Sequence, residues 1–539
     1  MSPLTTALQG AVDLAGGLRV LTREGLLEPT RPDRTLRAAR ETARLGPVTA
    51  SIRLARRRTP DAVALQDGPP EQGGTLTYAQ LDDRAAALAH RLLAAAPGSR
   101  PVVGLLARDH RGAVLTLAAC GYAGARAVLL NTGSAAPQLA QVLAREGVDV
   151  VVHDEEFADV VAAAGAAHTL RADGDDVLAA APTAAGPPPR PARSGGLVVL
   201  TSGTTGVPKG APRQRVNPLQ TAQVIDRLPF PRGAVVMMAA PTFHGTGLSQ
   251  TCLAFSAGCR VVLPGRFRAD AVAALVRDTR AEVLVAVPTM VHRLVALPDA
   301  GRDLATLRRI YVGGAALSPD LARRTHALLG GVLHNLYGST EVGIAAVASP
   351  ADLVVAPGCV GRPPVGARVR LLGPDRRPVA AGETGVIFVR SALAFSGYSD
   401  GTGKEVVDGY VSTGDLGFRD HHGLLHVVGR EDDMIVSGGE NVVPAQVEEL
   451  LASHPDVDEV AVVGVPDEEF GQRLRAVVVP AAGRAPDPEA LRTLAREQLA
   501  RHEVPREVWV VDALPRNATG KILRRVLAAA DTADELVGD

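Results

Sequence analysis

Residues 201–210 read TSGTTGVPKG, and they directly follow a run of four apolar residues, LVVL at 197–200. The glycines let the backbone come close to an anion, while the hydroxyls, the backbone N–H groups and Lys209 offer donors and positive charge. A strand that leads straight into such a loop predicts a phosphate-binding site, and a flexible linker is the alternative. The glycine spacing differs from that of a Walker A loop, which disfavours a P-loop NTPase.

Short apolar runs alternate with helical patterns on both sides of this loop. The runs that we expect to be strands are residues 102–106, 127–130, 149–153, 234–238, 260–263, 282–287, 309–312 and 332–336. A helical pattern spans 76–93, and others lie between the runs. The alternation predicts βαβ units and a largely parallel sheet.

The texture of the sequence changes beyond about residue 365. Three strand-like runs there are separated by Gly, Pro and Asp turns, at 368–372, 385–390 and 424–428. After residue 430 a shorter pattern has expected helices at 443–451 and 488–500 and expected strands at 459–463 and 475–479. We therefore expect an α/β protein with an N-terminal helical extension (1–45), a large domain (46–430, with a β-rich subdomain over about 365–430) and a small α+β domain (431–539).

The composition restricts the possible partners. With 57 basic and 58 acidic residues the formal charge is −1, so the chain has no overall attraction for nucleic acid. The four cysteines form no C-x-x-C pair and fit a reducing cytoplasm. The longest uncharged stretch, 233–259, contains Pro, His and Gln and predicts no transmembrane helix. For the N-terminal helical pattern and its nearby arginines, packing on the main body is expected, and weak peripheral membrane contact is the alternative.

Further motifs follow the loop in a fixed order. They are YGSTE at 337–341, STGD at 412–415, GREDD at 429–433 with SGGEN at 437–441, and Pro515 to Lys521. In this order the five signatures resemble those of the adenylate-forming superfamily, which includes acyl-CoA synthetases, stand-alone adenylation domains and luciferases. The match runs from about residue 50 to 530. Within the superfamily, the sequence resembles AMP-dependent fatty-acyl-CoA synthetases. It implies a mobile small domain and a need for ATP, Mg²⁺ and coenzyme A.

Adenylation brings a carboxylate to the α-phosphate of ATP, so such a site needs cations and oriented donors. Glu341 is a hard-oxygen ligand suited to Mg²⁺, Tyr337 offers a flat face for adenine, and Asp415 can accept from both ribose hydroxyls. The alternatives are ordinary surface, core and turn positions. The resemblance assigns phosphate binding to Thr201, Ser202, Gly203, Thr204, Thr205, Gly206 and Lys209, with Thr205 and Glu341 also catalytic. It assigns nucleoside binding to Gly314, Ala315, Tyr337, Gly338, Thr340, Asp415 and Arg430.

Lys521 is the strongest catalytic candidate. By resemblance it bridges the carboxylate and the phosphate in the transition state, where one such donor typically contributes about 3–4 kcal/mol. A solvated lysine in a turn is the alternative. The resemblance also makes Asp432 the pivot of the small domain. After the pivot turns, Gly438, Gly439 and Glu440 would line the tunnel for coenzyme A.

The segment PTFHG at 241–245 resembles the gate of the acyl site. This resemblance assigns the acyl pocket to Phe243, His244, Gly313 and Gly338. His244 is also a catalytic candidate, and a histidine of the core is the alternative. His244 stands where amino-acid-activating relatives carry an Asp, which disfavours an α-amino acid. Acetate-specific relatives narrow the pocket with a Trp, whereas the one Trp here, Trp509, lies in the small domain. We therefore expect room for a longer acid.

These features predict a cytoplasmic acyl-CoA synthetase that forms an acyl-adenylate and then a thioester with coenzyme A. A medium- or long-chain fatty acid is the expected substrate, and an aryl acid is the second class. The main alternative is a stand-alone adenylating enzyme that loads a carrier protein, and a nucleotide-binding protein without turnover is a third. We expect a monomer or homodimer.

Overall fold

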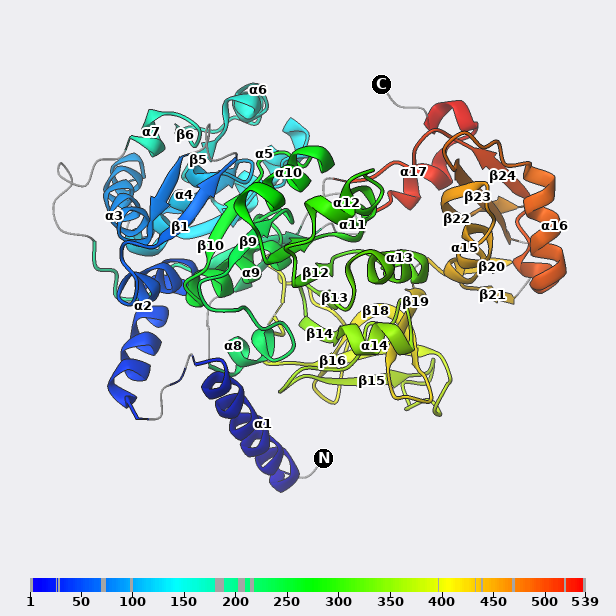
Figure 1. Ribbon diagram of the computed structural model, residues 1–539, viewed down its shortest axis with the longest axis horizontal. Coiled ribbons are helices and arrows are strands. Elements are labelled where there is room, and N and C mark those ends of the chain that lie inside the picture. Colours follow the sequence, from blue (N-terminus) through cyan, green and yellow to red (C-terminus); the bar gives the residue numbers. More distant parts are fainter. Residues whose placement is uncertain are drawn as a thin grey trace. The chain divides into compact units, whose positions relative to one another are not determined.

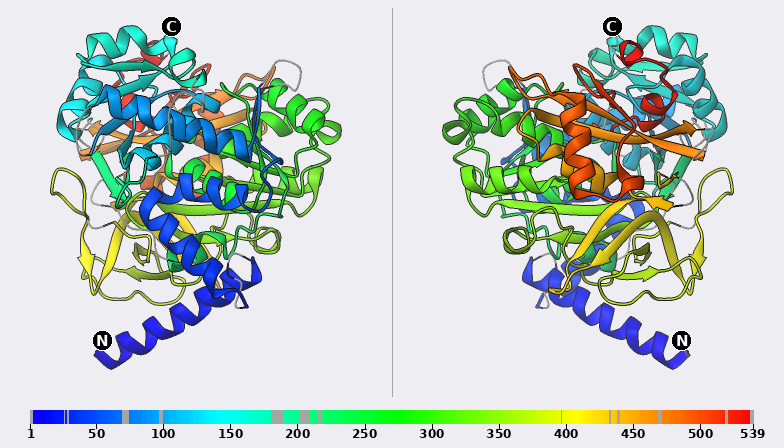
Figure 2. Two further views of the ribbon diagram at one scale, coloured as in Figure 1. Left: turned by 90° about the vertical axis from the view of Figure 1, so that its left-hand side faces the viewer. Right: turned by 90° about the vertical axis from the view of Figure 1, so that its right-hand side faces the viewer.

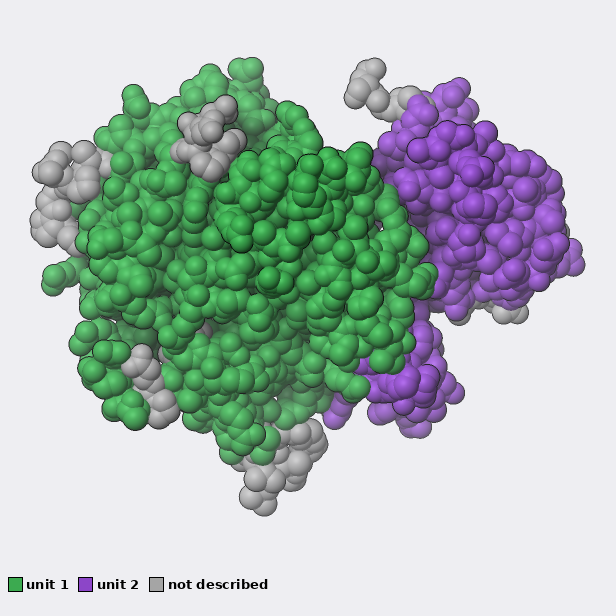
Figure 3. Space-filling view, viewed as in Figure 1, with its two compact units in different colours: residues 1–369, 389–411 green, residues 370–388, 412–539 purple. Residues whose placement is uncertain are grey.

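The computed structural model describes residues 3–25, 27, 30–68, 74–96, 100–179, 189–201, 209–213, 218–395, 397–431, 433–437, 440–467, 471–517 and 520–536 (Figure 1). The chain divides into two compact units (Figure 3). Unit 1 is residues 1–369 with 389–411, and unit 2 is residues 370–388 with 412–539. None of the described helices is long and apolar enough to cross a membrane.

Two helices open the chain, α1 (Pro3–Arg23) and α2 (Pro32–Arg56). α1 packs on α8 (Pro218–Ile225), and its Asp13 pairs with Arg368 at 2.7 Å. α2 bends at Gly46, where φ is 77°, and its second half is buried. The helical N-terminal extension therefore packs on the rest of unit 1.

A six-stranded sheet of unit 1 has the order β6-β5-β3-β4-β7-β8, parallel except for the β7–β8 pair. Its strands are β3 (Val102–Leu106), β4 (Arg126–Leu129), β5 (Val150–His153), β6 (Thr169–Arg171), β7 (Leu197–Thr201) and β8 (Lys209–Arg213). α3 (Tyr78–Ala95) and α4 (Arg111–Ala123) cover one face, and α5 (Ala136–Glu146) and α6 (Ala158–Ala163) cover the other. Burial on both faces explains why these strands are continuous apolar runs.

An eight-stranded sheet of unit 1 has the order β14-β13-β12-β11-β9-β10-β1-β2. Its strands are β1 (Val63–Asp67), β2 (Thr75–Thr77), β9 (Val235–Met238), β10 (Arg260–Leu263), β11 (Val283–Ala286), β12 (Arg309–Gly313), β13 (Leu333–Ser339) and β14 (Gly343–Ala348). The helices around it are α9 (Gly245–Ser256), α10 (Ala269–Thr279), α11 (Pro288–Val295), α12 (Ala300–Asp303), α13 (Pro319–Leu329) and α14 (Pro350–Val355). The run β1-β10-β9-β11-β12-β13 is parallel, so these strands end at one edge of the sheet. Segments 241–245, 313–315 and 337–341 lie at or just beyond the carboxyl ends of β9, β12 and β13, at that edge.

A third sheet has five strands, in which β18 pairs antiparallel with both β17 and β19. They are β15 (Arg368–Leu372), β16 (Gly385–Arg390), β17 (Val406–Val407), β18 (Tyr410–Arg419) and β19 (Leu425–Arg430). The STGD motif lies inside β18 and not in a turn.

The C-terminal part of unit 2 is built on a sheet of order β21-β20-β23-β22, with β24 beside β23. Its strands are β20 (Ile435–Ser437), β21 (Glu440–Val442), β22 (Val457–Asp467), β23 (Gly471–Pro480) and β24 (Glu507–Val510). α15 (Pro444–Ala452) and α16 (Pro488–Gln498) cover one face, and α17 (Arg524–Ala529) packs on the other (Figure 2).

The remaining short elements are α7 (Asp175–Leu178) and 3₁₀ turns at Glu155–Phe157, Arg501–Glu503 and Ala533–Leu536. The architecture confirms the expected fold class, with parallel α/β sheets, a β-rich part and a small α+β part. The boundaries at 45/46 and 430/431 stay predictions.

Candidate functional site

The predicted phosphate loop connects two antiparallel strands of unit 1. Thr201 ends β7 and lies opposite Lys209, the first residue of β8. The loop residues Ser202, Gly203, Thr204, Thr205 and Gly206 lie outside the described residues. The two strands therefore fix both ends of the loop and hold Lys209 beside it.

Lys209 contacts residues that follow it by about 190 positions. Its Nζ lies 3.1 Å from Asp400 Oδ2 and donates to Thr402 Oγ1 at 3.0 Å. The same atom lies 5.4 Å from the centroid of the Tyr398 ring. The hydrogen bonds from Thr402, with that from Lys209, lower the pKa of Asp400 to about 2. Asp400 is therefore an anion that faces the lysine at neutral pH.

Glu341 is 8% exposed, and hydrogen bonds hold both its backbone carbonyl and its carboxylate. The Phe395 N–H donates to its carbonyl oxygen at 2.8 Å, and the Tyr398 hydroxyl donates to its carboxylate Oε1 at 2.6 Å. No described residue donates a hydrogen bond to Oε2. The described residues contain no group of three or more acidic, His or Cys side chains that could hold a metal. A single carboxylate nevertheless fits Mg²⁺ that arrives with substrate phosphates, because Mg²⁺ commonly keeps several waters.

The nucleoside candidates of unit 1 lie on neighbouring strands. Gly313 on β12 is paired with Leu336 on β13, next to Tyr337. Gly314 has a φ of +87°, and a Cβ there would meet only Val287 within 4 Å. At Gly338 a Cβ would lie 2.0 Å from the carbonyl oxygen of Gly343, so only glycine fits. The structure thus brings segments 313–315 and 337–341 together, with Ala315 and Thr340 half-buried.

The gate segment precedes α9 directly. The His244 ring lies 4.3 Å from the Phe243 ring. Its Nε2 is buried and has no hydrogen-bond partner among the described residues. Burial lowers the pKa of His244 to about 4, so the ring is neutral at physiological pH.

Two residues that sequence reasoning missed support this segment. Asp109 is buried and accepts hydrogen bonds from the N–H of Thr242, at 2.9 Å, and from its hydroxyl. Burial raises the pKa of Asp109 to about 6. Gln250 on α9 is fully buried, and in the described part of the chain neither Nε2 nor Oε1 has a partner. Gln250 could have been found from the sequence, because it is a polar residue within the uncharged stretch 233–259.

In unit 2, Asp415 and Arg430 form a cross-strand ion pair between β18 and β19, at 2.9 Å. Gly414, with φ of +75°, lies directly beneath the guanidinium of Arg430. The proposed pivot, Asp432, lies outside the described residues. The strands therefore place Asp415 and Arg430 together.

Lys521 lies in a tight turn of unit 2. Its N–H donates to Asn517 Oδ1 at 2.9 Å, and the Asn517 N–H donates to the Lys521 carbonyl at 2.9 Å. Its side chain is exposed, and no described carboxylate lies within ion-pairing distance of its ammonium group. Gly438 and Gly439 lie outside the described residues, and Glu440 begins β21. The turn thus fixes the backbone of Lys521 and leaves its side chain exposed.

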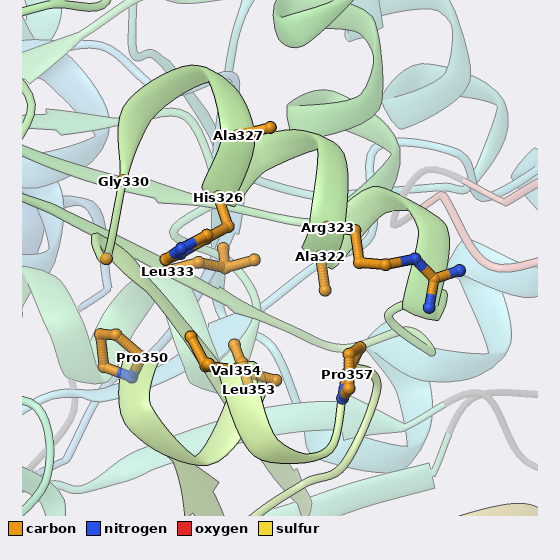
Figure 4. A pocket seen from close by; sticks show the side chains of 11 residues that line it. Ala322, Arg323, His326, Ala327, Gly330, Leu333, Pro350, Leu353, Val354 and Pro357 are labelled. Atoms are coloured by element: carbon orange, nitrogen blue, oxygen red, sulfur yellow. The ribbon is translucent and has the colours of Figure 1, made fainter.

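A pocket of about 170 Å³ lies elsewhere in unit 1, between α13 and α14 (Figure 4). Its lining includes His326, Leu333 and Leu353. None of the predicted site residues lines it.

Comparison with known proteins agrees with these features. The family described as "AMP-binding enzyme" matches residues 52–399, and "AMP-binding enzyme C-terminal domain" matches residues 446–521. The chain belongs to the AMP-binding enzyme family. This membership confirms the resemblance to the adenylate-forming superfamily. Adenylate-forming CoA ligases use ATP, Mg²⁺ and coenzyme A.

This AMP-binding enzyme is 37% identical over 479 residues to a feruloyl-CoA synthase of an Amycolatopsis species, across 87% of this chain and 96% of the relative. It is 33% identical over 477 residues to the fatty acid–[acyl-carrier-protein] ligase ScoC of Streptomyces coeruleorubidus, across 85% and 92%. The solved o-succinylbenzoate CoA synthetase of Bacillus subtilis, in complex with its acyl-adenylate, matches with a TM-score of 0.77. That pair is 27% identical, over 90% of this chain and 98% of the other.

Proposed function

We propose that this chain is an AMP-forming CoA ligase whose substrate is an aromatic carboxylic acid with a polar ring substituent. The ligase assignment is carried by the match of both family domains to a chain that retains Lys209, Glu341 and Lys521. A nucleotide-binding protein without turnover has no need of all three.

In the first step, a carboxylate oxygen of the acid forms a bond to the α-phosphorus of ATP, and the bond to pyrophosphate breaks. Lys209 and the phosphate loop bind the triphosphate, and Lys521 neutralises the charge that develops between the two anions. Mg²⁺ on the phosphates, held by Glu341, would supply further positive charge. Asp415 accepts from the ribose hydroxyls, and Arg430 orients it.

In the second step, the thiol of coenzyme A attacks the acyl carbon and AMP leaves. We propose that the small domain turns at Asp432 between the steps and presents the Gly438–Glu440 loop to the pantetheine arm. Two glycines in this loop would let the arm pass close to the backbone.

Our proposal for the substrate class is based on two polar side chains, His244 in the gate segment and Gln250 on α9. His244 Nε2 and both polar atoms of Gln250 are buried without a partner among the described residues. An unpaired buried polar group costs about 1–3 kcal/mol, so an alkyl chain would leave that cost in place, whereas a ring hydroxyl or methoxy group would remove it. The feruloyl-CoA synthase, 37% identical, supports an aromatic acid. We therefore propose a fatty acid, the substrate class expected from the sequence, as the second candidate.

A carrier protein as acceptor is the second candidate, because the ligase ScoC is 33% identical over most of both chains. The cytoplasmic location and the monomeric or dimeric state stay predictions.

The test is pyrophosphate release from ATP across paired acids that differ by one ring hydroxyl, with the products analysed by mass. We expect pyrophosphate release to be fastest with a hydroxylated aryl acid. We expect the CoA thioester of that acid to form when coenzyme A is present. If pyrophosphate is released but the acyl-adenylate does not react with coenzyme A, a carrier protein is favoured as the acyl acceptor. Faster turnover of alkyl acids would contradict the aromatic assignment.

A further inference from the structure

A short turn in unit 1 lies between two parts of the site that are far apart in sequence. We call residues 397–402 the strap. Within it, the Tyr398 N–H donates to the Thr402 carbonyl at 2.9 Å, and the hydroxyl of Thr402 donates to Asp400 Oδ1 at 2.6 Å. Gly397 and Gly401 adopt φ values of +137° and +79°, which favour glycine. The strap is therefore a compact turn whose conformation is fixed by its own hydrogen bonds.

The strap is anchored on β8, the strand that leaves the phosphate loop. The Ser399 N–H donates to the Gly210 carbonyl at 2.9 Å. Its hydroxyl donates to Glu146 Oε1 at 2.6 Å, and the side chain of Glu146 is 1% exposed. A Cβ at Gly210 would lie 2.6 Å from that carboxylate oxygen, so a side chain there would break the contact. This anchor fixes the position of Tyr398, the neighbour of Ser399.

From this position the strap contacts both charged candidates. The Tyr398 hydroxyl donates to Glu341 Oε1 at 2.6 Å, and the Tyr398 ring lies beside Lys209. Asp400 and Thr402 hold the ammonium group of Lys209. One turn thus links the phosphate-loop lysine to the candidate metal ligand.

We propose that Tyr398 is a positioning residue: its hydroxyl binds Oε1 of Glu341 so that Oε2 is directed to the Mg²⁺ that accompanies the nucleotide. A carboxylate with one oxygen fixed by a hydrogen bond loses less side-chain freedom when the other oxygen binds a cation. The proposal rests on the proposed function, which identifies ATP as the nucleotide that brings the Mg²⁺. Tyr398 lies outside the five motifs.

The test uses the full chain with the variant Tyr398→Phe, which removes only the hydroxyl. Calorimetry measures the Kd of α,β-methylene-ATP, with Mg²⁺ and with EDTA. Loss of a residue that hydrogen-bonds to a metal ligand typically lowers metal affinity 10- to 100-fold. We therefore expect the Kd of the ATP analogue to rise about tenfold with Mg²⁺ and to stay unchanged in EDTA. The Mg²⁺ concentration for half-maximal turnover should rise in parallel, with an unchanged KM for the acid.

The matched control is Tyr78→Phe, which removes another buried hydroxyl of unit 1 that donates to the Cys259 carbonyl at 2.7 Å. We expect this variant to keep the Mg²⁺ dependence of the wild type. If Tyr398→Phe binds the nucleotide as the wild type does in Mg²⁺, or weakens equally in EDTA, the positioning role is wrong. If the wild type forms no thioester but Tyr398→Phe still shows the Mg²⁺-specific loss, the ligase assignment fails and the role of Tyr398 stands.

Discussion

Asp415 on β18 lies directly opposite Arg430 on β19, and the carboxylate and guanidinium groups are 2.9 Å apart. Arg430 also donates to the Thr413 carbonyl at 3.2 Å, which fixes the guanidinium from a second side. The Asp415 side chain is 13% exposed, so the ion pair is well shielded from solvent. Asp415 is therefore held in place by its partner strand and by Arg430, which suits the proposed contact with a ribose.

The variant Asp415→Ala should raise the KM for ATP by about ten- to hundredfold, because hydrogen bonds to a charged group contribute about 1.5–3 kcal/mol. Steady-state kinetics of pyrophosphate release at saturating acid measures it. Asp420→Ala is the control, since Asp420 lies on the same hairpin and pairs with His426 at 2.9 Å. An unchanged KM for ATP in Asp415→Ala would show that this carboxylate does not bind the nucleoside.

The variant Lys521→Ala should slow adenylation about a hundred- to a thousandfold, because it removes one donor to the developing charge. Thioester formation from preformed acyl-adenylate should keep most of its rate. Single-turnover assays of each step separate the two effects, and Arg501→Ala, an exposed cation of the same unit, is the control. Equal losses in both steps would contradict a role for Lys521 in adenylation alone.

His244 predicts a specific dependence of stability on pH. Burial lowers the pKa of His244 to about 4 in the folded chain, while the unfolded chain keeps a value near 6.5. Between these values the unfolded state binds more protons, so the contribution is fully present above pH 6.5 and is lost as the pH falls towards 4. We expect the stability of the wild type relative to His244→Asn to fall by about 2 kcal/mol between pH 7 and pH 5. Urea unfolding at both pH values measures this, and a difference that does not change with pH would refute an imidazole held neutral in the folded chain.

Gln250 connects stability with substrate choice. Replacing its two unpartnered polar atoms with an apolar side chain of similar size, in Gln250→Met, should raise the free energy of unfolding by about 1–2 kcal/mol. The same variant should reduce the preference in kcat/KM for a hydroxylated over an unsubstituted aryl acid by about tenfold. Gln223→Met is the control, because the amide of Gln223 donates to the Ile344 carbonyl at 2.9 Å. Since this variant loses that hydrogen bond, we expect its free energy of unfolding to fall. A destabilised Gln250→Met with unchanged acid preference would mean that the amide serves the core.

The alternation of elements could be predicted from the sequence, since strands buried on both faces leave uninterrupted apolar runs. The runs at 102–106 and 260–263 match β3 and β10 residue for residue. The half-buried strand β15 also matches its predicted range, 368–372. β18 was missed because its STGD motif, with glycine and polar residues, is typical of a turn. In the structure its partner strands supply the hydrogen bonds that its composition does not indicate.

The candidate site was predicted where chemistry follows from local motifs, as at Lys209, Glu341 and Asp415. Its supports were not predictable, because they depend on contacts between distant positions. Tyr398 reaches Glu341 across 57 residues, and Asp109 reaches Thr242 across 133. Only the fold brings such pairs together.

One incubation decides whether this chain is a CoA ligase: the wild type is mixed with ATP, Mg²⁺, coenzyme A and a hydroxylated aryl acid, and the products are identified by mass spectrometry. We expect AMP, pyrophosphate and the aryl-CoA thioester in equal amounts, and no thioester when ATP is left out. Nucleotide binding without pyrophosphate release across both aryl and alkyl acids would contradict the ligase assignment.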